Sequence, residues 1–77
     1  MQTESKPILT IFENKVFRTN FSEINQIQNI LLLIHGYTGD ENSMWLFGRD
    51  VPPNTLIIAP RAPFLSALGG YSWIDEI

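Results

Sequence analysis

Hydrophobic residues in this chain gather in a few short runs that polar and turn-forming residues separate. After a polar stretch at residues 1–6, which is predicted to be a disordered tail, two β-prone runs occur at residues 7–12 and 15–19. Only Glu13 and Asn14 separate these runs, so residues 7–19 are predicted to form a β-hairpin. This pair is not the Asn-Gly that best suits a primed turn, so the hairpin is better specified than its register.

The next runs predict a strand, a helix and a second strand. Residues 29–36 are an apolar stretch that ends at a glycine, as expected of a strand covered on both faces of a parallel sheet. The acids and asparagine at 40–42 suit the start of a helix, where negative charge is favoured, and predict a helix over residues 41–48. Residues 55–59 form the second strand, which stops at a proline. Residues 29–59 are therefore predicted to be a βαβ unit of the α/β class.

This βαβ unit has two structural consequences. A right-handed crossover makes its strands parallel and places the loop after Ile34 at the carboxyl edge of the sheet, where ligands of α/β folds bind. Residues 60–77, punctuated by proline and glycine, are predicted to be a loop close to this site. One helix, with Met44, Trp45 and Phe47 as its core-facing side, covers one face of a sheet that needs cover on both. The missing layer is expected to come from later residues, which is the simplest case, from a partner chain or from self-association.

Composition narrows the class of protein. The chain has 77 residues, of which 44% are hydrophobic and 12% aromatic, as in one small globular domain or a piece of a larger one. A net charge of −3 without a basic run argues against nucleic-acid binding. The apolar run at residues 30–34 is far shorter than the roughly 20 residues that cross a bilayer, and no signal-peptide core begins the chain. A cytoplasmic protein without a membrane span is expected, and the absence of cysteine excludes disulfides and thiolate chemistry.

One segment and two later ones carry a resemblance to a known family. At residues 35–39, His-Gly-Tyr-Thr-Gly follows an apolar strand and precedes an acidic helix start, which resembles the oxyanion loop of α/β-hydrolases. Ala-Pro-Arg-Ala-Pro at 59–63 and Gly-Gly-Tyr-Ser-Trp-Ile-Asp at 69–75 are similar to the phospholipase/carboxylesterase branch, which is acyl-protein thioesterase-like. The resemblance covers residues 30–75 and only the early part of a full family member. It implies the N-terminal part of an α/β-hydrolase fold.

The resemblance also implies roles for the residues of the loop. Gly36 is expected to let the backbone turn sharply off the strand and aim a main-chain N–H into the site, and the resemblance assigns that oxyanion donor to Tyr37. Gly36 and Tyr37 are then expected to bind substrate, and His35 and Gly39 to be structural. The alternative for the tripeptide alone is that glycine merely ends a strand. His35 is not expected to be the catalytic base, because the base follows the nucleophile and the acid in α/β-hydrolases.

A nucleophile, a catalytic acid and a base are not found in the sequence. The nucleophile elbow requires G-x-S-x-G, whereas Ser72 is followed two residues later by the bulky Ile74 and is interpreted as a loop serine. Asp75 and Glu76 are neighbours that tend to face opposite ways, and they are interpreted as solvated acids. A lone histidine cannot make a metal site, so no metal or other cofactor is predicted.

Two further residues allow two interpretations each. Trp73, with Tyr71 beside it, either lines the pocket for an ester, as the resembled segment does, or packs as an ordinary aromatic residue. Arg61 either holds its loop through hydrogen bonds to carbonyl groups or to Asp75, or is a surface arginine.

Two functions are compatible with these observations. The first is the N-terminal portion of a serine carboxylic-ester hydrolase, which supplies the oxyanion loop, is inactive alone, and in its complete form acts on a small-molecule or lipid ester. The alternative is a small non-catalytic binding or dimerisation module that covers its bare sheet face with a copy of itself.

Overall fold

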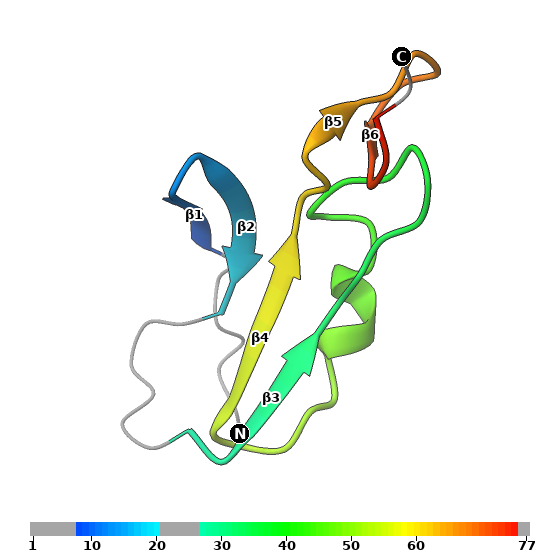
Figure 1. Cartoon of the computed structure of the whole chain (residues 1–77). Coiled ribbons are helices and arrows are strands. Elements are labelled where there is room, and N and C mark those ends of the chain that lie inside the picture. The colour runs from blue at the N-terminus through cyan, green and yellow to red at the C-terminus, as the bar shows by residue number, and fades with distance from the viewer. Residues whose placement is uncertain (1–7, 21–26, 76–77) are drawn as a thin grey trace.

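The fold was analysed in a computed structural model of the chain, which describes residues 8–20 and 27–75; the predicted tail at 1–6 and Glu76 lie outside these ranges. The described residues form a four-stranded mixed sheet in the order β1-β2-β4-β3 and a two-stranded ribbon, β5-β6 (Figure 1). The elements are β1 (Ile8–Phe12), β2 (Lys15–Thr19), β3 (Asn29–Leu32), the 3₁₀ helix η1 (Trp45–Gly48), β4 (Thr55–Pro60), β5 (Phe64–Leu65) and β6 (Tyr71–Ser72). A mixed sheet with a crossover between parallel strands agrees with the α/β class in its coarse form.

Strands β1 and β2 form the hairpin that the sequence predicts. They pair antiparallel with Phe12 opposite Lys15, which leaves the two-residue link at the turn. Glu13 and Asn14 have φ angles of 50° and 64°. Positive φ at both central positions is the signature of a type I′ turn, whose twist matches that of the flanking strands. A primed turn therefore forms here without glycine, and the register of the hairpin follows from it.

Strands β3 and β4 are the parallel pair, and η1 lies on the connection between them. The prediction of a helix over residues 41–48 is wrong, because residues 41–44 form turns and only Trp45–Gly48 is helical. Side chains compete with helical hydrogen bonding at its start: the Asp40 carboxylate accepts from the Asn42 N–H at 2.8 Å, and the Ser43 hydroxyl accepts from the Asp40 N–H at 2.9 Å.

The predicted strand at residues 29–36 is also too long. Regular β3 pairing ends at Leu32, although the Leu33 N–H still donates to the Ile58 carbonyl at 2.9 Å. After this last sheet contact the chain leaves β4, and the residues that follow belong to the loop. The shorter strand places the start of the loop, including His35, beyond the end of the sheet.

The core lies on one face of the parallel pair. Leu33, Ile57 and Ala59 are buried there, and partly buried residues of the connection pack against them, namely Met44, Trp45 and Val51. The prediction that Phe47 faces the core is wrong, since it is 63% exposed. The single 3₁₀ turn that replaces the predicted helix brings Trp45 against the sheet and leaves Phe47 in solvent.

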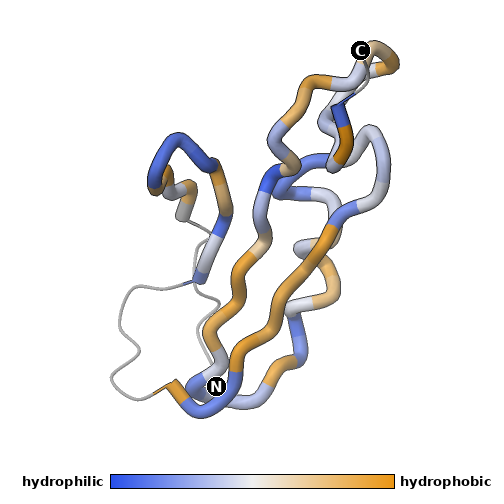
Figure 2. The backbone as a smooth tube through the Cα atoms, viewed as in Figure 1, coloured by the Kyte–Doolittle hydropathy of each residue, from blue (hydrophilic) through white to orange (hydrophobic). Residues whose placement is uncertain are grey.

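The opposite face of the parallel pair is open. Ile30, Leu32 and Ile34 are 67%, 55% and 49% exposed, and the residues opposite the first two, Leu56 and Ile58, are only partly buried. Figure 2 shows that the middle of both strands is strongly hydrophobic. We call these five side chains the open face. Within residues 8–20 and 27–75, no helix is both long and apolar enough to cross a membrane.

Candidate functional site

The candidate site lies at the carboxyl edge of the parallel pair. Here the loop at residues 35–39, which follows β3, meets the β5–β6 ribbon, which follows β4 (Figure 1). Two main-chain hydrogen bonds join them: Thr38 N–H donates to the Tyr71 carbonyl at 3.0 Å, and Tyr71 N–H donates to the Gly39 carbonyl at 2.9 Å. Segments more than 30 residues apart in sequence are thereby fixed side by side.

His35 anchors the loop from within. It is buried, its Nε2 accepts a hydrogen bond from the Ala62 N–H at 3.0 Å, and its Nδ1 lies 2.7 Å from the Gly36 carbonyl oxygen. This pattern assigns the neutral tautomer with the hydrogen on Nδ1, which donates to that carbonyl. Both ring nitrogens are engaged by the main chain, so His35 has no nitrogen left over for proton transfer in this arrangement.

Trp73 supports the same histidine from the other side. Its ring stacks on the His35 imidazole with centroids 4.9 Å apart, and its indole N–H donates to the His35 carbonyl at 2.8 Å. Trp73 nevertheless remains 38% exposed. The side chain therefore packs against the loop, as the second interpretation expects, and leaves part of its ring at the surface; its role in binding an ester stays a prediction.

Gly36 and Tyr37 form the outward part of the loop. A Cβ built on Gly36 meets no atom within 4 Å, and its φ is not in the positive range. The expectation that the turn depends on the conformational freedom of Gly36 is wrong, because the left-handed residue is Thr38, with φ 69°. Tyr37 is 55% exposed, and among the described residues its N–H has no hydrogen-bond acceptor. An unengaged donor thus borders the open space at Gly36.

Two other glycines allow close main-chain approaches, Gly39 within the loop and Gly70 between the ribbon and the loop. A Cβ on Gly39 would lie 2.9 Å from the Ser43 hydroxyl and 3.1 Å from the Gly36 carbonyl oxygen. Gly70 has φ 66°, and a Cβ there would lie 1.9 Å from the Thr38 carbonyl oxygen. Gly70 is therefore required both for its conformation and for the contact that the ribbon makes with the loop.

An ion pair joins the residues just after the loop to the residues just after β4. The Arg61 Nε and Nη2 atoms donate to the two carboxylate oxygens of Glu41 at 2.7 and 2.8 Å, and the Arg61 guanidinium lies over the Tyr71 ring at 4.6 Å. The Arg61 hydrogen bond lowers the pKa of the Glu41 carboxyl, against the opposing effect of burial, and Glu41 raises the pKa of Arg61. Glu41 is buried and paired, so the expectation that it serves the start of a helix is wrong.

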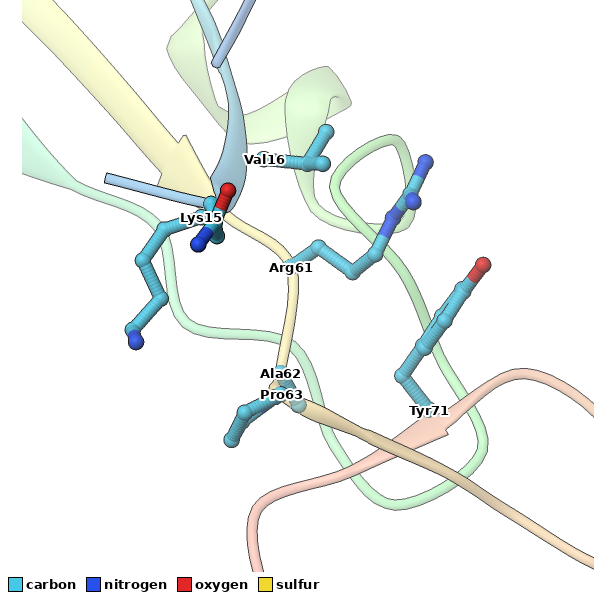
Figure 3. A pocket seen from close by; sticks show the side chains of 7 residues that line it. Lys15, Val16, Arg61, Ala62, Pro63 and Tyr71 are labelled. Atoms are coloured by element: carbon cyan, nitrogen blue, oxygen red, sulfur yellow. The ribbon is translucent and has the colours of Figure 1, made fainter. Parts of the chain in front are cut away.

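A pocket of about 220 Å³ lies beside this ion pair, between the β1–β2 hairpin and the residues that follow β4 (Figure 3). Gly36, Tyr37 and Trp73 are not among its described lining residues, so it is not the predicted substrate site. Its lining comprises Asn14, Lys15, Val16, Arg61, Ala62, Pro63 and Tyr71.

Ser72 is part of the scaffold. It is fully buried, and its hydroxyl donates to the Ile74 carbonyl at 2.8 Å and accepts from the Ile74 N–H at 3.2 Å. The interpretation of Ser72 as a loop serine is wrong, because it lies in β6 and these contacts hold its hydroxyl within the ribbon. In the part of the chain that the structure describes, no three His, Cys, Asp or Glu side chains come together as a metal site would require.

The structure thus gathers His35, Gly36, Tyr37, Gly39 and Trp73 into one site, and it adds residues that sequence reasoning missed. Glu41 and Arg61 were considered separately, but neither their sequence spacing nor a motif indicated that they pair. Comparison with known proteins gives no further guide, since no family model, no curated protein and no solved structure matches this chain.

Proposed function

We propose that this chain is the N-terminal portion of a serine carboxylic-ester hydrolase of the phospholipase/carboxylesterase type, with the α/β-hydrolase fold, and that it supplies the oxyanion loop. The observation that carries the proposal is the Tyr37 N–H, which has no acceptor among the described residues and borders open space at Gly36. It lies at the carboxyl edge of parallel strands, where ligands of α/β folds bind.

The chemistry follows from the position of this donor. When an alcohol nucleophile attacks an ester carbonyl, negative charge develops on the carbonyl oxygen, and a fixed N–H stabilises that charge most when it need not reorganise. The main-chain hydrogen bond of Thr38 and the ring contacts of His35 hold the loop on either side of Tyr37. In the proposed enzyme, the second donor and the serine, acid and base come from residues outside this chain, and the substrate is a small-molecule or lipid ester.

The coding sequence beyond Ile77 gives the first test. The proposal expects a G-x-S-x-G elbow there, followed by an acid and then a histidine, in the order of α/β-hydrolases. A reading frame that ends without them overturns the proposal. The 77-residue chain alone is expected not to react with a fluorophosphonate probe, and a labelled serine in it would contradict the assignment.

The Tyr37 N–H is tested by a proline substitution in the product of the complete reading frame. Tyr37→Pro removes the donor; Tyr37 has no positive φ, and the preceding glycine carries no Cβ to clash with the proline ring. Tyr37→Ala is the matched control, because it removes the side chain and keeps the N–H. For hydrolysis of a p-nitrophenyl ester, we expect kcat to be about 10²–10³ lower in the proline variant than in the alanine variant. Equal kcat values would show that this N–H is not an oxyanion donor.

The open face favours a second function, that of a small dimerisation module. Exposed apolar patches of this kind commonly mark interaction surfaces. In this case sedimentation of the 77-residue chain should give a folded dimer, and Leu32→Lys should give a monomer because it introduces a charge on the open face. Leu65→Lys is the control, since Leu65 is 77% exposed on the ribbon. A monomeric parent chain would rule out this second function.

A further inference from the structure

We propose that Glu41 and Arg61 are positioning residues, whose ion pair sets the orientation of the Tyr37 N–H by fixing the 35–39 loop against the residues after β4. This inference rests on the proposed function of that N–H. Neither side chain contacts the Tyr37 donor directly in the interactions described above, so their effect is exerted through the segments that they join.

The geometry of the pair is that of a rigid clamp. Two nearly parallel hydrogen bonds of 2.7 and 2.8 Å join the guanidinium fork to both carboxylate oxygens. The Glu41 side chain is only 6% accessible and that of Arg61 26% accessible, so water screens the pair weakly. A planar bidentate contact fixes angle as well as distance, which a single hydrogen bond or a lysine does not.

The positions of the two residues connect this clamp to both ends of the loop. Glu41 follows Gly39, at the end of the loop, by two residues. Arg61 immediately precedes Ala62, whose N–H binds the His35 ring at the start of the loop. One ion pair therefore ties the end of the loop to the segment that also holds its beginning.

Arg61 has a second contact, with Tyr71, that also connects it to the 35–39 loop. Its guanidinium lies 4.6 Å from the centre of the Tyr71 ring, and the Tyr71 main chain bonds to both Thr38 and Gly39. Tyr37 lies between the His35 anchor and the Thr38 anchor. A change in the position of Tyr71 relative to Arg61 would thus move Thr38, the residue next to the proposed donor.

A stabilising role alone is a weaker explanation of this pair. Removing two charges from water costs free energy that their attraction often fails to recover, and well-packed apolar residues commonly serve stability as well or better. What a partly buried bidentate pair provides is directional geometry. An oxyanion donor requires such geometry, since a displacement of about 1 Å can lower the rate by about a hundredfold.

The test uses the product of the complete reading frame with Glu41→Gln and Arg61→Lys, which keep size or charge and lose the fork. Both variants are expected to fold, to retain KM, and to lower kcat by about tenfold to a hundredfold. Affinity for an alkyl trifluoromethyl ketone, whose tetrahedral adduct carries an oxyanion, should fall by the same factor as kcat. Arg49→Lys and Asp50→Asn are the controls, because both residues are exposed, and they should leave both quantities unchanged.

The outcomes separate this inference from the proposed function. If Tyr37→Pro lowers kcat relative to Tyr37→Ala while Glu41→Gln and Arg61→Lys behave as the parent, the positioning role is wrong and the oxyanion role stands. If Tyr37→Pro has no effect relative to Tyr37→Ala, the proposed function fails and this inference fails with it. Loss of folding in both charge variants, or a rise in KM without a fall in kcat, assigns the pair to stability or ground-state binding and overturns the positioning role.

Discussion

Substitution of Gly70 with alanine tests how the 35–39 loop is held to the β5–β6 ribbon. The added Cβ would lie 1.9 Å from the Thr38 carbonyl oxygen and 2.4 Å from its carbonyl carbon, both main-chain atoms that cannot rotate away. The loop and the ribbon must therefore separate. Gly69→Ala is the matched control, because Gly69 also has a positive φ, 104°, but a Cβ there meets nothing within 4 Å.

The magnitude follows from what the separation breaks. A left-handed or otherwise unusual φ costs a non-glycine residue about 1–3 kcal/mol, and both variants bear this cost. Only Gly70→Ala also disrupts the two main-chain hydrogen bonds between Tyr71 and the loop, each with a net contribution of about 0.5–1.5 kcal/mol. Gly70→Ala should therefore be less stable than Gly69→Ala by about 1–3 kcal/mol.

Urea denaturation followed by tryptophan fluorescence measures this difference, since Trp73 stacks on His35 at the base of the loop. Amide hydrogen exchange at Thr38 and Tyr71 locates it, because both N–H groups should lose protection in Gly70→Ala and keep it in Gly69→Ala. Equal unfolding free energies, together with protected amides in both variants, would refute the view that backbone contact at Gly70 holds the loop.

Three further predictions concern the anchors of the loop. The pKa of Glu41 is lowered in the folded chain by its hydrogen bond to Arg61. Its contribution to stability is therefore present above the ordinary glutamate pKa of about 4.3 and is lost as the pH falls through the depressed folded pKa. Urea midpoints in this acid range should depend on pH more steeply in the parent than in Glu41→Gln. His35→Phe should keep a ring against Trp73 but leave the buried Ala62 N–H without its acceptor. The loss should lower the unfolding free energy by about 1–3 kcal/mol. A variant as stable as the parent would contradict the assigned hydrogen bond. Thr38→Gly should raise the unfolding free energy by about 1 kcal/mol in the same assay, because it relieves a β-branched residue with φ 69°, whereas a decrease would indicate that the threonine side chain contributes more than its strain costs.

The elements of the sheet could be predicted because local patterns specify them. Apolar runs bounded by turn residues indicate strands wherever they occur, and the two-residue link at Glu13 and Asn14 leaves little choice but a hairpin. The helix was predicted wrongly from the same kind of pattern. Asp40 suits a helix start, but here its carboxylate and the Ser43 hydroxyl bind the backbone in turns, and sequence alone does not decide between these outcomes.

The site was predictable only in part, for a different reason. The residues of the loop are adjacent in sequence, so one motif identifies His35, Gly36 and Tyr37 as parts of the same candidate site. The partners of the loop and of the residues beside it lie much further along the chain: Ala62 and Trp73 bind His35, and Arg61 pairs with Glu41. Charge and residue type indicate that such groups need partners, but they carry no information about which partner the fold brings near.

The anchors of His35 have a consequence for how the site is made. Its ring binds Ala62, 27 residues away, and its carbonyl binds Trp73, 38 residues away. During synthesis the loop at residues 35–39 leaves the ribosome well before either anchor, at roughly 5–20 residues per second. The loop therefore stays without its partners for seconds, until Ala62 and Trp73 have both been synthesised. Contacts of this sequence separation also form slowly, because the intervening chain must be ordered first. Formation of the site is thus expected to lag behind formation of the hairpin.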